Sequence, residues 1–219
     1  MRIIAVCFFL IFSTITSGYS QENDIGAIQT NIRAFSGGGK NIKAIDEYRK
    51  LFTQTKTHDT ELLHRIVMGS LRDEDGYMKM AGAIAVGQLG GSTEAFPFLR
   101  DNLKEKDMWI RIWTAVSIGE TGDKDAVPNL LYALLNDRVA FVRISAAVAL
   151  GKLGDASIIP DVAKALKDKE ANVRQMAAIA LGRIGDPKAI PYLENAMMEE
   201  KDTWAKLAAV AALEKILAK

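Results

Sequence analysis

Apolar residues follow a helical period through most of the chain, in two kinds of segment that alternate. One kind carries a proline near its start, as in AVPNLLYALL (126–135) and IIPDVAKAL (158–166). The other kind is rich in alanine, as in FVRISAAVALGKL (141–153) and NVRQMAAIALGRI (172–184). Spacings of three and four between apolar positions are typical of amphipathic helices. The pattern therefore predicts pairs of helices, each with a proline-bearing first helix and an alanine-rich second helix.

These pairs form an internal repeat with a period of 31–32 residues. The junctions between helices align as VGQLGGSTEAFP (86–97), IGETGDKDAVP (118–128), LGKLGDASIIP (150–160) and LGRIGDPKAIP (181–191). In each junction the second glycine, such as Gly154, can end a helix, and the next residue, such as Asp155, can cap another. The first glycine, such as Gly151, costs about 1 kcal/mol inside a helix, which predicts that a neighbouring helix approaches closely. We expect the prolines to bend the first helices: Pro97, Pro128, Pro160 and Pro191.

Charged residues recur in step with the repeat. Basic residues stand at Lys79, Arg111, Arg143, Arg174 and Lys206. An acidic residue lies six positions before each, at Asp73, Glu105, Asp137, Asp168 and Glu200. We expect each basic residue to bind the carboxylate or the carbonyls of the turn in its own repeat, which would hold the helices together. A ladder that binds a ligand is the alternative. The predicted structural ladder consists of Lys79, Arg111, Asp137, Arg143, Asp168 and Arg174.

At these residues the chain resembles the HEAT-repeat proteins, particularly the phycobilisome-lyase type. The family pattern V-R-x-x-A-A-x-A-L-G-x-I-G is matched from Val173 to Gly185, and the resemblance extends over about 60–217. The outer copies depart from it at Gly82, Thr114, Ser117 and Glu214. The resemblance implies an all-α fold, a right-handed α-solenoid of antiparallel helix pairs (an armadillo-like superhelix). It also implies that the second helices line the concave side, and it implies no particular partner.

The N-terminal third follows a different pattern. Arg2 precedes an apolar run from Ile3 to Phe12, and small and polar residues follow, which is the layout of a secretory signal peptide. A membrane anchor is the alternative, but the run is about half the 20 residues that span a bilayer. We therefore expect a signal peptide at 1–20, a divergent helical cap at 21–59 and a HEAT-like domain of about five helix pairs at 60–219. The protein is then exported, periplasmic or secreted, with no membrane span after cleavage.

Composition narrows the chemistry further. The 28 basic and 27 acidic residues nearly cancel, which argues against binding to nucleic acid. The single cysteine, Cys7, excludes a disulfide framework and would leave with the signal peptide. The two histidines, His58 and His64, lack partners at ligand spacing, and the GGGK at 37–40 lacks the rest of a phosphate-binding loop. We expect no catalytic residue, no metal and no cofactor.

The second helices carry more apolar residues than a single buried face requires. Relative to each basic residue, positions −2, +1 and +5 share one face, and thirteen of the fifteen residues there are apolar. About seven would be expected from the 49% apolar composition, so we expect a second buried surface. Either superhelical curvature makes neighbouring second helices cover this face, or it forms an exposed apolar groove. The predicted partner-binding residues are Tyr77, Met80, Ile84, Trp109, Ile112, Trp113, Val116, Phe141, Ile144, Val148, Ile179 and Trp204.

These observations predict a non-catalytic interaction module, a scaffold that binds a partner segment in its concave apolar groove. The partner would be another protein or a second copy of the chain. Two alternatives remain open: a carrier or lyase-like protein that binds an apolar, tetrapyrrole-like molecule, and a structural spacer.

Overall fold

The computed structural model describes Met68, Leu71 and residues 76–88 and 93–218. These residues belong to the second of the two units into which the chain divides, 58–219. The expected signal peptide at 1–20, the expected cap at 21–59, His58 and His64 lie outside the described residues. The described residues are helical or form turns, with no strand among them.

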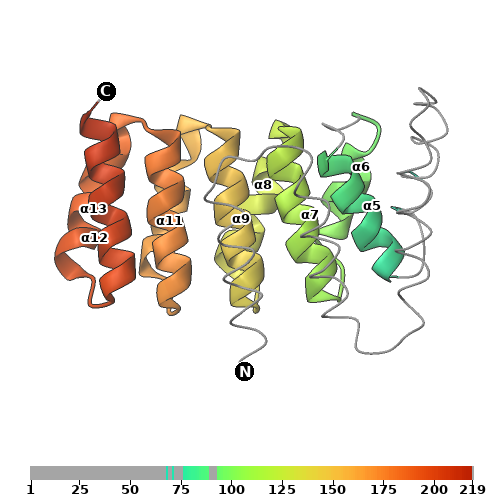
Figure 1. Ribbon diagram of the computed structural model, residues 1–219, viewed down its shortest axis with the longest axis horizontal. Coiled ribbons are helices and arrows are strands. Elements are labelled where there is room, and N and C mark those ends of the chain that lie inside the picture. Colours follow the sequence, from blue (N-terminus) through green and yellow to red (C-terminus); the bar gives the residue numbers. More distant parts are fainter. Residues whose placement is uncertain (1–67, 69–70, 72–75, 89–92, 219) are drawn as a thin grey trace. The chain divides into compact units, whose positions relative to one another are not determined.

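Two kinds of helix alternate along this unit (Figure 1). The second helices of the pairs are α5 (Gly76–Gln88), α7 (Met108–Thr121), α9 (Ala140–Leu153), α11 (Ala171–Ile184) and α13 (Thr203–Leu217). The first helices are α6 (Phe96–Asn102), α8 (Val127–Asn136), α10 (Ile159–Lys164) and α12 (Ile190–Glu199). Short 3-10 turns join them at η1 (Lys124–Ala126), η2 (Ala156–Ile158), η3 (Ala165–Lys167) and η4 (Pro187–Ala189). The predicted α-solenoid of antiparallel helix pairs is therefore confirmed.

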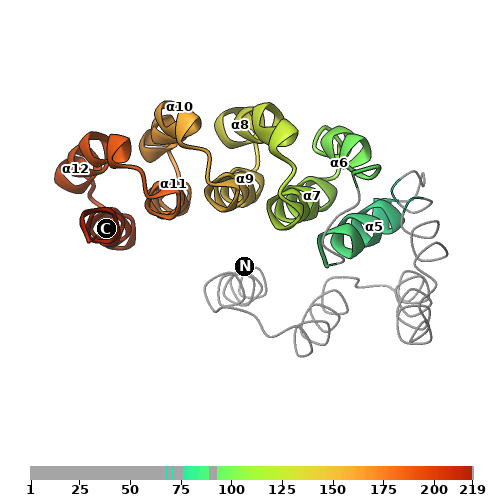
Figure 2. The ribbon, with the colours of Figure 1, turned by 90° about the horizontal axis from the view of Figure 1, so that it is seen from above.

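The two kinds of helix form two layers. Figure 2 shows α6, α8, α10 and α12 along the outer side of an arc and the second helices along its inner side. Between the layers lie fully buried apolar side chains, for example Leu130 and Val162 from the first helices and Val142 and Leu181 from the second. One stripe of each helix thus faces the shared core, as the helical period predicts.

The helix ends follow the glycine and aspartate positions of the repeat. Gly122, Gly154 and Gly185 have φ angles of 75°, 68° and 69° and end α7, α9 and α11. The aspartate after each glycine then accepts a hydrogen bond from the backbone N–H two residues later, as Asp155 does from Ser157. The aspartates therefore cap the 3-10 turns that lead into the first helices, with the left-handed glycine as the stop signal.

The expectation for the prolines was wrong. Each lies in the first turn of a first helix, at the second residue of α6, α8, α10 and α12. A proline at this position lacks an N–H that the helix would leave unpaired anyway, and its fixed φ suits the first turn. Pro97, Pro128, Pro160 and Pro191 therefore start these helices and do not bend them.

The glycines inside the second helices are sites of close helix approach, as predicted. A Cβ added to Gly119 would lie 2.8 Å from the Cα of Ala149, and one added to Gly151 would lie 2.8 Å from the Cα of Ala180. At Gly182 the nearest atom would be the Cβ of Ala212, also at 2.8 Å. Each second helix therefore packs backbone to backbone against the next, which offsets the low helix propensity of glycine.

Candidate functional site

The ladder of charged residues runs along one edge of the second helices. The Arg143 guanidinium donates to both carboxylate oxygens of Asp168, with Nε–Oδ2 at 2.7 Å and Nη2–Oδ1 at 2.8 Å. Its Nη1 donates to the Asp137 carbonyl at 2.8 Å. Arg111 makes the same contacts with Asp137 and the Glu105 carbonyl. Lys79 forms an ion pair with Glu105.

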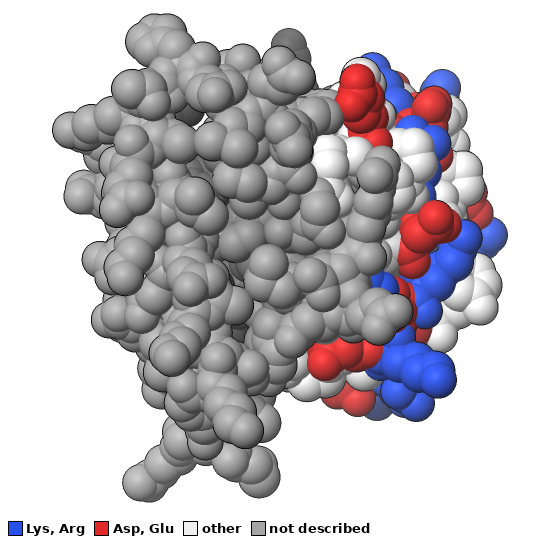
Figure 3. Space-filling model, turned by 90° about the vertical axis from the view of Figure 1, so that its right-hand side faces the viewer, with Lys and Arg blue, Asp and Glu red and all other residues white. Residues whose placement is uncertain are grey.

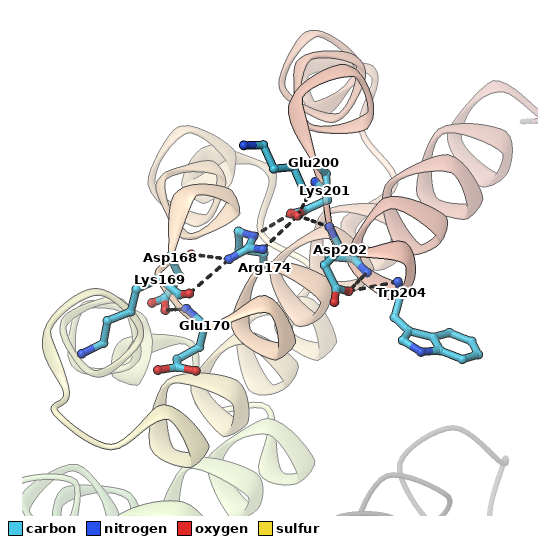
Figure 4. Close-up of polar contacts among 9 residues, drawn as sticks. Asp168, Lys169, Glu170, Arg174, Glu200, Lys201, Asp202 and Trp204 are labelled. Atoms are coloured by element: carbon cyan, nitrogen blue, oxygen red, sulfur yellow. Dashed lines mark hydrogen bonds and ion pairs between the residues drawn. The ribbon is translucent and has the colours of Figure 1, made fainter.

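The Arg174 member of this ladder is drawn in Figure 4. Arg174 donates to both carboxylate oxygens of Glu200, at 2.6 and 2.8 Å, and to the Asp168 carbonyl at 2.8 Å. Hydrogen bonds from Arg174 and from the backbone N–H groups of Asp202 and Lys201 outweigh the effect of burial and lower the pKa of Glu200 from 4.5 to about 2. Glu200 is thus ionised throughout the neutral pH range.

The carboxylate partner differs from the one that the sequence analysis expected. The carbonyl acceptor does belong to the turn of the same repeat, six positions earlier. The carboxylate comes from the next repeat, 25 or 26 positions later. Each arginine therefore ties its own turn to the following one. With only 5–7% of the Arg143 and Arg111 side chains exposed, this geometry favours a structural ladder over a ligand site.

The expected partner-binding residues lie on the second helices and differ in exposure. Three of them, Met80, Ile112 and Ile144, directly follow a basic residue, and we call this register, which also holds Gln175 and Leu207, the stacking positions. Each lies seven residues, about two turns, before a close-approach glycine or its equivalent, so it faces the next second helix. Met80, Ile112 and Ile144 are 7%, 3% and 7% exposed. They are buried in the chain, which differs from the expected open groove.

The remaining positions point farther toward the inner side. Val148 is 5% exposed and also buried, whereas Trp204 is 68% exposed. The side chain of Tyr77 lies outside the described residues. The half-buried members of this group are Ile84, Trp109, Trp113, Val116, Phe141 and Ile179. We call these six residues together with Trp204 the inner stripe.

The outer layer also carries a groove that the sequence pattern did not predict. It has a volume of about 780 Å³, lies between α10 and α12, and is lined by Pro160, Lys167, Tyr192 and Asn195 among others. The helix α10 ends at Lys164 and continues as η3, which packs on α11. A short first helix was the available signal, but the sequence pattern alone does not show where a helix changes to a 3-10 turn.

Neither a metal cluster nor a membrane span occurs among the described residues. No group of three or more His, Cys, Asp or Glu in that part of the chain could hold a metal ion. None of the described helices is long and apolar enough to cross a membrane. In Figure 3, the part of the described surface that faces the viewer carries both acidic and basic side chains, in agreement with the nearly balanced charge.

Stacked antiparallel helix pairs with a 31–32-residue period define an α-solenoid repeat protein. Residues 66–151 and 127–214 match the family described as HEAT repeats, over more than half of the chain. The chain therefore belongs to the HEAT-repeat family. No curated protein matches it significantly.

Several solved structures share this fold. The complex of CpcE and CpcF of phycocyanin lyase from Nostoc sp. PCC7120 is 19% identical, with a TM-score of 0.56, and the match covers 90% of this chain and 76% of that chain. An engineered protein is also 19% identical, with a TM-score of 0.54 and coverage of 95% and 96%. Human deoxyhypusine hydroxylase in complex with glycerol is 16% identical, with a TM-score of 0.50 and coverage of 100% and 96%. At these identities the likeness is one of fold.

Proposed function

We propose that the protein is a non-catalytic scaffold that binds a segment of another protein along the inner stripe. The exposure of Trp204, at 68%, is the observation that carries this proposal. Trp109 and Phe141 occupy the same register on α7 and α9 and are half-buried. Tryptophan and other large aromatic residues are the usual anchors of protein interfaces, because they bury a large rigid surface at low entropic cost.

Burial of the stacking positions moves the proposed contact area. Ile112 and Ile144, which were among the predicted partner-binding residues, are buried and leave the proposed contact area. The proposed area then follows Trp109, Phe141 and Ile179 toward Trp204. Its apolar character predicts that binding depends weakly on salt concentration, because screening acts on charges.

The setting of this function is part of the proposal. The apolar run at 3–12 favours export, so we look for the partner in the periplasm or outside the cell. The family match supports a binding role, because repeat solenoids present extended curved surfaces to partners.

A carrier of an apolar, tetrapyrrole-like molecule is the second candidate, supported by the likeness to the CpcE–CpcF complex. Native mass spectrometry and the visible absorption spectrum of the purified protein separate the two candidates. A stoichiometric bound mass with visible absorption would favour the carrier. A colourless protein of the chain's own mass favours the scaffold.

Site-specific photo-crosslinking tests the scaffold function. A photoreactive phenylalanine analogue replaces Trp204, and a matched control replaces Tyr132, which is 71% exposed but lies on the outer helix α8. We expect one discrete crosslinked partner from position 204 in the native compartment and none from position 132. The adduct should disappear when Phe141→Ala is added. Equal adducts from both positions, or none from position 204, would contradict the proposal.

A further inference from the structure

The last described helix, α13, differs from α7, α9 and α11 at both glycines of the repeat. The close-approach glycine of α7, α9 and α11 is replaced by Glu214, and the left-handed glycine that ends those helices is replaced by Leu217. As a result α13 stays helical through Leu217. The side of α13 that faces away from α11 is therefore an uninterrupted helical surface.

This side of α13 carries two exposed leucines. Leu207 occupies the last stacking position and is 52% exposed, whereas Ile144, in the same register of α9, is 7% exposed. Leu217 is 69% exposed and Val210 is half-buried. The spacing of four and three residues is typical of helices that pack side by side. We call this set the end stripe: Thr203, Leu207, Val210, Glu214 and Leu217.

The end stripe does not suit another HEAT repeat. Where a repeat follows, a Cβ on Gly182 would come within 2.8 Å of Ala212, so the contact leaves no room for a side chain. Glu214 occupies that register in α13 and prevents such an approach. A helix that packs through its side chains, at the usual interaxial distance of about 8–10 Å, fits instead.

We propose that the end stripe binds the end stripe of a second copy of this chain, with the two α13 helices antiparallel and a twofold axis beside Val210. The stripe is self-complementary about that residue. Thr203 and Leu217 lie seven positions to either side, and the exposed residues Lys206 and Glu214 lie four positions to either side. In the antiparallel pair each Lys206 stands level with the partner's Glu214, so two opposite-charge contacts flank the apolar centre.

Met198 supports this placement from the neighbouring helix. It is 72% exposed. Its counterpart in the preceding repeat is Lys167, which lines the groove between α10 and α12. Met198 therefore lies on α12, the helix that pairs with α13. An exposed methionine adds apolar surface of the kind that marks interaction sites.

Sedimentation velocity of the full chain over a concentration series, up to about 100 μM, tests the proposal. We expect a monomer–dimer equilibrium whose dissociation constant rises about 100-fold with Leu207→Glu. Lys206→Glu or Glu214→Lys should each raise it about tenfold, because each places like charges face to face twice. The double variant Lys206→Glu/Glu214→Lys should return to within about threefold of the wild type.

The control is Lys188→Glu, an exposed lysine of the same repeat on η4, which should leave the dissociation constant unchanged. At a concentration where the chain is monomeric, thermal unfolding of every variant should match that of the wild type, because the substituted side chains are exposed. A monomer at all concentrations overturns the proposal. A dimer that survives Leu207→Glu, or that the charge exchange does not restore, overturns it as well.

Discussion

The helices α9 and α13 carry the same repeat but have different surroundings. In α9 the residues Val142–Gly151 are all buried, with neighbouring second helices on both sides. In α13 the face that would meet a next second helix is accessible to solvent, with Leu207 52% exposed. Glu214 takes the place of the glycine that lets a neighbouring helix approach. One sequence pattern thus serves two purposes: it supplies the interface between repeats inside the solenoid and an accessible apolar surface at its end.

The largest difference between the two helices should appear at the ladder. Arg143→Ala leaves the partly buried Asp168 carboxylate without its bidentate partner, so the free energy of unfolding should fall by about 3–5 kcal/mol. Lys206 occupies the same register of α13 and is exposed. Lys206→Ala should therefore change the free energy of unfolding by less than about 0.5 kcal/mol. Urea denaturation measures both. Equal losses would show that the ladder does not tie repeats together.

The stacking positions should differ almost as much. Ile144→Ala removes buried contacts with the next helix and should lower the free energy of unfolding by about 2–4 kcal/mol. Leu207→Ala removes a side chain that is 52% exposed and should lower the free energy of unfolding by less than about 1 kcal/mol. Both values come from chemical denaturation at a protein concentration where the chain is monomeric. A large loss at Leu207 would contradict the assignment of its face as accessible.

The ladder should also make stability depend on pH. The pKa of Glu200 is lowered from 4.5 to about 2, so its stabilising effect is present above pH 4.5 and is lost as the pH falls toward 2. Glu200→Gln should therefore cost about 1–3 kcal/mol at neutral pH and reduce the loss of stability between pH 4.5 and 2. The exposed Glu194 supplies the control, Glu194→Gln. Identical acid denaturation curves for wild type and Glu200→Gln would refute this role.

The smallest expected effect concerns a buried hydroxyl. Thr114 is fully buried, and its Oγ1 has no hydrogen-bond partner in the part of the chain that the structure describes. The same register holds Ala146, Ala177 and Ala209. Thr114→Ala should therefore leave stability unchanged or raise it by up to about 1 kcal/mol. The reverse change, Ala146→Thr, should lower it by about 1–3 kcal/mol, and differential scanning calorimetry compares the two.

Local features of the fold followed from the sequence, because each depends on a few neighbouring residues. The helix pairs come from the apolar period, the helix ends from Gly122 and Gly154, and the turns from aspartates such as Asp155. Even the close approach at Gly151 could be predicted, because glycine weakens an alanine-rich helix unless a neighbouring backbone occupies the space of its missing side chain. The position of the prolines near the start of the first helices was predicted correctly, but their role was not, since a bend and a helix start both accommodate proline.

Features that depend on how repeats stack could not be predicted in the same way. The partner of Arg143 is Asp168, and only the relative position of two repeats decides between it and Asp137. Likewise the burial of Ile144 depends on how closely α11 approaches α9. The exposure of Trp204 and Leu207 reflects their place on the last described helix, which the repeat pattern itself does not distinguish.

Cysteine labelling compares the two environments of one register most directly. In a Cys7→Ser background, which leaves no other cysteine, Ile144→Cys and Leu207→Cys each supply a single thiol. Under native conditions, at a concentration where the chain is monomeric, Leu207→Cys should react with a maleimide within about tenfold of the rate for the unfolded chain. Ile144→Cys should react at least about 100-fold more slowly than Leu207→Cys. Equal rates at the two positions would contradict the claim that the stacking position is buried on α9 and accessible on α13.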